Sequence, residues 1–182
     1  ERVALNILMR LSGIATMTAQ YVDKIADLPT QLVDTRKTTP GLRLLEKYAV
    51  QVGGGQNHRF GLDDAVMIKD NHIQAAGGIS QAIALVQQNM PYPLAIEVEA
   101  ETLEQAFEAV TAGADILMLD NMSVDMMADL IPQLRSKNPR LKLEASGNIT
   151  LETLREVALT GIDYISTSAT ITRAPWLDIS MK

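Results

Sequence analysis

Short β-rich runs alternate with amphipathic stretches through most of this chain, and this alternation constrains the fold more than any other feature of the sequence. The last four β-rich runs begin near residues 94, 116, 141 and 164. Between them lie stretches whose apolar residues recur at helical spacing. Strands that alternate with helices in this way predict βα units and a parallel sheet.

The expected elements fall into two sets. We expect strands at 31–35, 65–69, 94–99, 116–120, 141–146 and 164–167, and helices near 2–19, 41–52, 79–89, 102–112, 124–136 and 150–160. No glycine-rich dinucleotide fingerprint follows any strand, whereas charged and hydroxyl side chains do, as at the C-terminal face of a TIM barrel. The sequence therefore predicts an α/β fold, an incomplete TIM-like (β/α) barrel with parallel strands. Residues 1–20 would form an amphipathic helix leading into the barrel, and residues 21–182 would form the α/β-barrel catalytic domain.

Composition excludes several classes of function. The chain has 182 residues and no cysteine, so disulfides and thiolate metal sites are excluded. It contains no apolar run long enough to span a bilayer and no signal-peptide pattern, so we expect a cytoplasmic protein that does not interact with membranes. The net charge is −6, although residues 1–60 hold eight Lys or Arg against five Asp or Glu. An acidic chain with a local cation excess and few aromatic residues favours a small anionic ligand over nucleic acid.

Two segments gather the cations that such a ligand needs. Residues 57–72 contain both histidines of the chain together with Arg59 and Lys69. Residues 34–41 contain Arg36 and Lys37 among threonines and a glycine. Guanidinium and ammonium groups gathered from two loops indicate a substrate that carries several carboxylates or phosphates.

Carboxylates follow two consecutive strands of the predicted sheet. Glu99 and Asp120 come at the ends of these strands, so we expect both to face the same mouth of the barrel. Carboxylate oxygens are ligands that Mg²⁺ prefers, and they also stabilise positive charge that develops at an anomeric carbon. Glu97 shares a strand face with Glu99 and is expected to support it, while Asn121 and Glu144 are weaker candidates.

The order of these motifs resembles a known enzyme family, nicotinate-nucleotide pyrophosphorylase, also called quinolinate phosphoribosyltransferase. The matching segments are ERVALN at 1–6, LSGIAT at 11–16, DTRKTTPGL at 34–42, EKYAV at 46–50, GGGQNHR at 53–59, IKDNH at 68–72, IEVE at 96–99, MLDN at 118–121 and EASG at 144–147. Several long motifs in the right order are far more specific than any one of them. The resemblance implies that this sequence is the barrel domain of the family, without the N-terminal α/β sandwich domain that precedes the barrel there.

The resemblance also implies a reaction and a set of site residues. Quinolinate and phosphoribosyl pyrophosphate would give nicotinate mononucleotide, pyrophosphate and CO2 with Mg²⁺ as cofactor, in a homodimer with a shared active site or in a higher oligomer. The residues that would bind quinolinate are Arg2 (from a second subunit), Arg36, His58, Arg59 and Lys69. The residues that would bind phosphoribosyl pyrophosphate are Lys37, Glu99, Asp120, Ser146, Gly147 and Ser168. Lys69, Glu99 and Asp120 would be catalytic, and the two carboxylates would hold Mg²⁺ partly through water.

Three positions depart from the family pattern, and other functions remain open. Asn148 and Ser168 stand where glycines are usual, and Arg173 stands near the usual place of a histidine. One alternative is a paralogue of the same barrel associated with molybdenum transport, and another is a catalytically incomplete fragment. A third is a Schiff-base aldolase-type barrel that uses Lys69. Arg2, taken by itself, is better explained as a solvated helix terminus.

Overall fold

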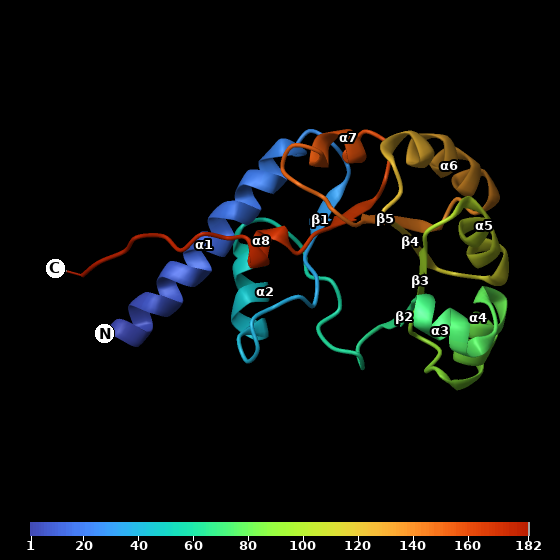
Figure 1. Ribbon diagram of the computed structural model, residues 1–182, viewed down its shortest axis with the longest axis horizontal. Coiled ribbons are helices and arrows are strands. Elements are labelled where there is room, and N and C mark those ends of the chain that lie inside the picture. The colour runs from blue at the N-terminus through green and yellow to red at the C-terminus, as the bar shows by residue number, and fades with distance from the viewer. Residues whose placement is uncertain (182) are drawn as a thin grey trace.

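Six parallel strands form one curved sheet in this protein. The structure, a computed structural model, describes residues 1–181 (Figure 1). The strands are β1 (Gln31–Val33), β2 (Val66–Ile68), β3 (Ile96–Ala100), β4 (Ile116–Asp120), β5 (Lys142–Ser146) and β6 (Tyr164–Ser166). They pair in the order β1-β6-β5-β4-β3-β2. From β2 to β6 each strand pairs with the next in the chain, which is the one-way winding of a barrel, and the order leaves β1 and β2 at opposite edges. The predicted incomplete (β/α) barrel is confirmed.

Helices follow the strands and cover the outer side of the sheet (Figure 1). The helices are α1 (Arg2–Lys24), α2 (Arg43–Val52), α3 (Asp70–Ala76), α4 (Ile79–Asn89), α5 (Leu103–Ala112), α6 (Val124–Lys137), α7 (Leu154–Ala158) and α8 (Ala169–Thr172). All six predicted helices are present. The sequence did not predict the short helices α3 and α8. α1 continues to Lys24 rather than ending at residue 19. α7 begins at Leu154 rather than 150, because residues 151–153 form a turn.

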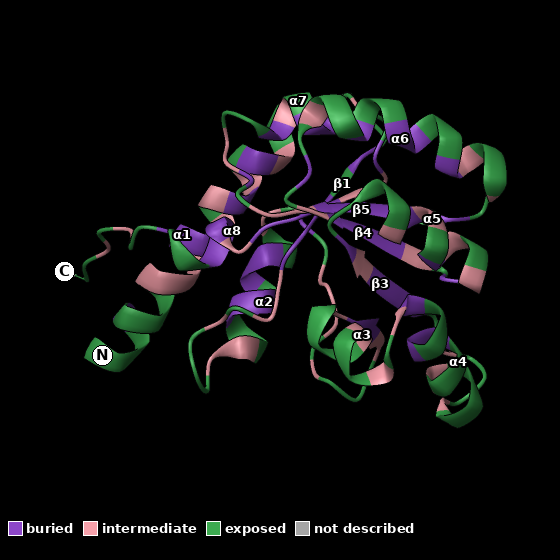
Figure 2. Ribbon diagram, turned by 45° about the vertical axis from the view of Figure 1, so that its right-hand side comes forward, coloured by how far each residue is buried: buried purple, intermediate pink, exposed green. Residues whose placement is uncertain are grey.

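The two faces of the sheet differ in chemistry because side chains alternate along each strand. The apolar residues of the central strands point outward and join the main core with the covering helices; they include Val98, Leu117, Leu119, Leu143 and Ala145. The inward positions of the same strands hold carboxylates and hydroxyls, and they include Glu97, Glu99, Asp120, Glu144 and Ser146. Figure 2 shows the buried strands at the centre of the molecule. A polar inner face does not serve as a hydrophobic core, so the interior of this barrel is available for a site.

α1 packs into the body of the molecule mainly through its C-terminal half. Ile14, Thr18 and Tyr21 are buried there, whereas most residues of the first two turns are exposed and Leu5 alone is buried among them (Figure 2). Gly13 is required where the helix meets the C-terminal segment, because a Cβ at this position would lie 1.9 Å from the carbonyl oxygen of Pro175. In the part of the chain that the structure describes, no helix has the length and apolar character needed to cross a membrane.

Candidate active site

Two adjoining cavities open at the C-terminal ends of the strands. The first, of about 380 Å³, has Arg36, Arg59 and Lys69 in its wall together with the side chains of Met67 and Met118. The second, of about 480 Å³, is lined mainly by polar groups from the ends of β4, β5 and β6. We call them the cationic cavity and the polar cavity. Five residues line both, so the cavities form one continuous cleft; the shared residues are Thr35, Lys37, Asp120, Ser146 and Ser166.

Arg36 and Arg59 bring two guanidinium groups to the cationic cavity. The Nε of Arg36 is buried and has no hydrogen-bond partner among the described residues. Arg59 donates to the carbonyl oxygen of Ala65 at 3.1 Å and to the Sδ of Met67 at 3.4 Å. Burial lowers the pKa of Arg59, and the positive charge of Arg36 lowers it further. Two guanidinium groups near each other, one of them with an unused hydrogen-bond donor, are the arrangement expected of a site for an anion that carries several negative charges.

Lys69 lines the same cavity and forms an ion pair with Glu99. The side chain of Lys69 is 39% exposed and that of Glu99 is 12% exposed, so both reach the cleft. The Nζ of Lys69 donates to this carboxylate, whereas Schiff-base formation requires an amine nitrogen that is free to attack a carbonyl carbon. This contact therefore does not support the aldolase-type alternative.

The polar cavity is built on the paired ends of β4 and β5. Asp120 is aligned with Ser146 in the parallel ladder, and both side chains line the cleft. The backbone N–H of Asn121 donates to the carbonyl oxygen of Ser146 at 2.9 Å. Gly147 has φ 96°, and a Cβ there would lie 2.1 Å from the Oδ1 of Asn121. Glycine at 147 is therefore required by the close approach of the two loops.

Asn148, one of the three departures from the family pattern, adopts a left-handed conformation. Its φ is 51°, a region that glycine occupies without strain and that asparagine tolerates better than most residues. Its Nδ2 donates to the Oδ1 of Asn121 at 3.2 Å. The backbone shape that glycine would provide is thus kept here by asparagine.

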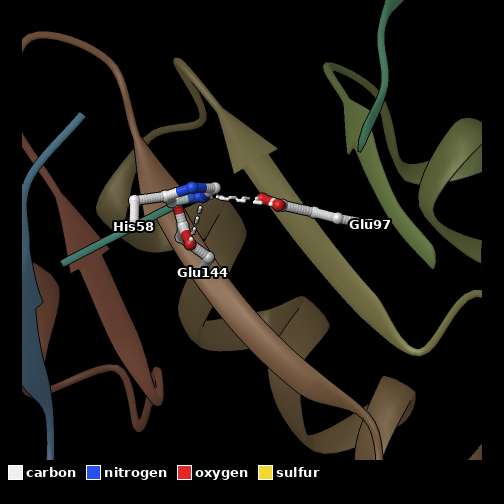
Figure 3. Close-up of side chains that lie close together, drawn as sticks. All are labelled: His58, Glu97 and Glu144. Carbon is white, nitrogen blue, oxygen red and sulfur yellow. Dashed lines mark hydrogen bonds and ion pairs between the residues drawn. The ribbon is translucent and has the colours of Figure 1, made fainter. Parts of the chain in front are cut away.

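His58 lies between two carboxylates from β3 and β5 inside the barrel (Figure 3). Its Nε2 is 3.3 Å from the Oε2 of Glu97 and 3.5 Å from the Oε2 of Glu144. Its Nδ1 accepts a hydrogen bond of 2.7 Å from the backbone N–H of Arg59. Both ring nitrogens therefore have partners within the protein, although His58 also lines the cationic cavity.

Two buried carboxylates act on the imidazole of His58. Burial alone would lower the pKa of His58, but the hydrogen bonds and negative charges of Glu144 and Glu97 raise it to about 10. Burial raises the pKa of Glu97 as well. Because Nδ1 accepts a hydrogen bond, the proton of the ring lies on Nε2, which faces both carboxylates.

The same three groups lie close enough together to hold a metal ion, with ligand atoms within 4.8 Å of one another. A metal would need the lone pair of Nε2, because Nδ1 already accepts a hydrogen bond. In this structure Nε2 faces the two carboxylates as part of a hydrogen-bonded group.

The structure brings together most of the residues predicted from the sequence. Arg36, His58, Arg59 and Lys69 share the cationic cavity, and Glu99 lies beside them. The residues that line the polar cavity include Lys37, Asp120, Ser146, Gly147, Ser168 and Arg173. Arg2 is exposed at the start of α1, far from the cleft of its own chain (Figure 1). Its predicted role in a second subunit stays a prediction.

Three buried charged residues near the site did not receive a role from the sequence. They are Asp34, Glu46 and Lys47, with 0%, 0% and 1% of each residue exposed. Lys47 forms a buried ion pair with Asp34, and Arg10 pairs with Glu46 at 2.9 Å. Burial raises the pKa of Asp34, and the hydrogen bonds from Lys47 and two further donors, Asn57 and the backbone N–H of His58, only partly offset this rise. The one signal in the sequence is that Glu46 and Lys47 belong to the EKYAV segment, one of those that carry the resemblance.

Comparisons with known proteins agree with this geometry. The profile of the family described as "Quinolinate phosphoribosyl transferase, C-terminal domain" matches residues 14–182. The chain is 63% identical over its full length to a probable nicotinate-nucleotide pyrophosphorylase [carboxylating] of Synechocystis, and 44% identical to the nicotinate-nucleotide pyrophosphorylase [carboxylating] of Rattus norvegicus. In both cases it spans 62% of the relative's length. The crystal structure of NadC from Streptococcus pyogenes superposes with a TM-score of 0.94 at 50% identity, over 100% of this chain and 63% of that one.

Proposed function

The chain belongs to the quinolinate phosphoribosyl transferase family, and we propose that it carries the catalytic barrel of a nicotinate-nucleotide pyrophosphorylase (carboxylating). The reaction would convert quinolinate and phosphoribosyl pyrophosphate into nicotinate mononucleotide, pyrophosphate and CO2, a step of de novo NAD biosynthesis. The observation that carries this proposal is that two guanidinium groups, those of Arg36 and Arg59, share one cavity with Lys69 and with methionine side chains.

The cationic cavity suits a flat ring that carries two carboxylates. Guanidinium groups bind carboxylates through paired hydrogen bonds, and the Nε of Arg36 lacks a partner within the described residues. Met67 and Met118 offer polarisable apolar surface to the ring. A ligand with a single carboxylate would leave part of this positive charge uncompensated, so the site favours quinolinate over nicotinate.

The polar cavity suits the phosphoribosyl donor. Lys37 and Arg173 supply positive charge in its wall, while Ser146 and Ser168 offer hydroxyl groups to phosphate oxygens. The Oγ of Ser166, which lines both cavities, is buried and has no partner in the part of the chain that is described. An orphan hydroxyl in the wall of a cavity is expected to bind a ligand oxygen.

Glu99 and Asp120 fit the Mg²⁺ that the family implies. Both present carboxylate oxygens to the cleft from neighbouring strands, and oxygen donors of this kind are typical of magnesium sites that also bind a substrate phosphate. Bound there, the ion would neutralise charge on the pyrophosphate leaving group. Glu99 is also paired with Lys69, and Asp120 accepts a hydrogen bond of 2.8 Å from the Nδ2 of Asn121, so both carboxylates are held in place before any ligand binds.

The residues act by position and charge in this mechanism. Arg36, Arg59 and Lys69 hold quinolinate so that its ring nitrogen faces C1 of the ribose. The bond from C1 to the pyrophosphate oxygen breaks as the bond from nitrogen to C1 forms, and the nearby carboxylates stabilise the positive charge that develops at C1. The ring nitrogen is then cationic, and its charge stabilises the electron pair that stays on the adjacent ring carbon when the carboxylate departs as CO2. A proton takes the place of the lost carboxylate on the ring.

An activity assay on the intact protein tests the proposal. Quinolinate and phosphoribosyl pyrophosphate with Mg²⁺ should give nicotinate mononucleotide, measured by chromatography, and release of CO2 in equal amount. Nicotinate in place of quinolinate should give no product. Absence of product from quinolinate, with the protein folded by circular dichroism, would contradict the proposal. The homodimer with a site shared through Arg2 belongs to the same proposal, and Arg2→Ala should lower the affinity for quinolinate.

A further inference from the structure

One face of α2 contacts both of the loops that bring cations to the cleft. Arg43, Glu46 and Lys47 are spaced three and four residues apart, so they lie on the same side of the helix. None of the three lines either cavity. We refer to this set as the polar face of α2. The loops are residues 35–39, which carry Arg36 and Lys37, and residues 57–60, which carry His58 and Arg59.

Lys47 fixes the loop that carries Arg59. Its Nζ donates to the Oδ1 of Asp34 at the end of β1 and, at 2.9 Å, to the carbonyl oxygen of His58. Asp34 in turn accepts the backbone N–H of His58 at 2.9 Å and the Nδ2 of Asn57 at 2.7 Å. The peptide groups on both sides of His58 are therefore held by one buried ion pair.

Glu46 fixes the other loop. Its Oε2 accepts a hydrogen bond of 2.8 Å from the backbone N–H of Thr39, and its Oε1 accepts one of 2.8 Å from the Oγ1 hydroxyl of Thr39. Arg10 of α1 holds the same carboxylate through two hydrogen bonds of 3.0 and 2.9 Å. The loop that carries Lys37 is thus tied to two helices through one buried carboxylate.

Arg43 connects the two loops to each other. It donates to the Oγ1 of Thr38 at 3.1 Å in one loop and to the carbonyl oxygen of Phe60 at 3.0 Å in the other. Both loops lack regular secondary structure, so their peptide groups rely on contacts of this kind. A helix that needed only to pack would bury apolar side chains here, since buried charges stabilise less than apolar residues of similar volume.

We propose that Glu46 and Lys47 are positioning residues for the two substrates, Lys47 setting the quinolinate-binding loop and Glu46 setting the loop shared by quinolinate and the phosphoribosyl donor. The inference rests on the proposed function and adds to it which buried groups control which affinity. Arg36 and Arg59 come from separate loops, so their separation depends on the polar face of α2. A shift of about 1 Å between such groups reduces rates by roughly 100-fold in other enzymes.

The test uses two variants of the intact protein and two controls. Asp34→Asn with Lys47→Met removes both buried charges together, so that neither is left unpaired. Glu46→Gln removes one acceptor and keeps the shape. Lys142→Met is the same chemical change at an exposed site, and Gln51→Met is an exposed change on α2 itself. Steady-state KM for each substrate and amide hydrogen exchange of residues 57–59 are measured for all four.

The Asp34/Lys47 variant should raise the KM for quinolinate roughly 10- to 100-fold and leave the KM for the donor nearly unchanged. Glu46→Gln should raise both. Amide exchange at residues 57–59 should accelerate in the first variant and stay unchanged in the controls. Unchanged exchange and unchanged KM values would overturn the proposal. An equal rise of both KM values in the Asp34/Lys47 variant, in proportion to a fall in its melting temperature, would also overturn the proposal, because a purely structural role predicts that result. If the wild type fails to use quinolinate, the proposed function fails, and the exchange measurement still decides whether Lys47 fixes the loop.

Discussion

The two halves of the cleft are built in different ways. The acidic half comes from the central strands, where Glu97, Glu99, Asp120 and Glu144 occupy inward positions of β3, β4 and β5. The cationic half comes from the segments around the two edge strands, where Arg36 follows β1 and Lys69 follows β2. Parallel ladders on both sides fix the acidic half, whereas buried side-chain contacts fix much of the cationic half.

Because the two halves are fixed in different ways, we expect different residues to control the stability of the fold and the recognition of the substrate. The central strands are held by the large apolar core on their outer face, so their carboxylates keep their places whether or not a ligand is present. The loops at the edges depend on a few buried polar contacts, which are strong only when every partner is present. We therefore expect changes in the core to alter stability and changes at the edges to alter substrate binding.

The largest expected effect comes from removing both guanidinium groups. Arg36→Ala with Arg59→Ala should weaken quinolinate binding roughly 10²- to 10⁴-fold, because each charged contact contributes about 1.5–3 kcal/mol. Affinity for phosphoribosyl pyrophosphate should change little. Titration calorimetry with each ligand measures both values, and Arg140→Ala, at an exposed position, is the control. Unchanged affinity for quinolinate in the double variant would show that the segments at the edge strands do not bind the substrate.

A core truncation tests the opposite half. Leu143 on β5 is fully buried, so Leu143→Ala should lower the free energy of unfolding by about 2–5 kcal/mol. Urea denaturation measures the loss. At a temperature where the variant is still folded, the KM for quinolinate should equal that of the wild type. A large change in KM without loss of stability would contradict the expectation that core residues control stability and edge residues control substrate binding.

Lys69 sits where the halves meet, and its ion pair with Glu99 is partly exposed. Lys69→Met should change the free energy of unfolding by less than about 1 kcal/mol, since solvent screens such a pair. It should nevertheless reduce kcat/KM for quinolinate roughly 10-fold or more, because one charged contact to the substrate is lost. Lys69→Arg should recover part of the activity. Equal activity of the methionine variant would exclude a role for Lys69 in binding or catalysis.

The smallest expected effect lies outside the cleft, in the pair of Asp27 and Arg155. Its Oδ1 to Nη1 distance is 2.7 Å, and the hydrogen bond from Arg155 lowers the pKa of Asp27 to about 2. A carboxyl with a lowered pKa in the folded state stabilises the fold wherever it is ionised, so any benefit is present above pH 3.8 and disappears as the pH falls to about 2. Asp27→Asn should lower Tm slightly at pH 7 and not at all at pH 2, by calorimetry. A difference that grows as the pH falls would contradict this direction.

The acidic half was predictable from the sequence and the cationic half only in part. Strand rhythm and alternation of side chains place Glu99, Asp120 and Ser146 on one face, because the parallel register leaves few alternatives. Glu97 and Glu144 were given minor roles, since nothing in the local pattern shows that His58 comes from a loop to lie between them. The short helices α3 and α8 were missed because four to seven residues carry too little periodicity to be recognised.

The buried charges of α2 show where sequence reasoning ends. Glu46 and Lys47 look like the solvated face of an amphipathic helix, the usual place for adjacent charges. Their partners, Thr39 and Asp34, lie 7 and 13 residues away along the chain, in loops or at a strand end. Contacts of this kind depend on how loops fold over a helix, and neither periodicity nor composition encodes that arrangement.

Titration calorimetry of quinolinate into the intact wild-type protein, with nicotinate as the control, tests the central claim most directly. If Arg36, Arg59 and Lys69 read two carboxylates on one ring, quinolinate should bind much more tightly than nicotinate, by roughly 10-fold or more for the additional charged contact. Equal affinities for the two acids would contradict the claim, because the edge segments would then recognise only the ring and one carboxylate.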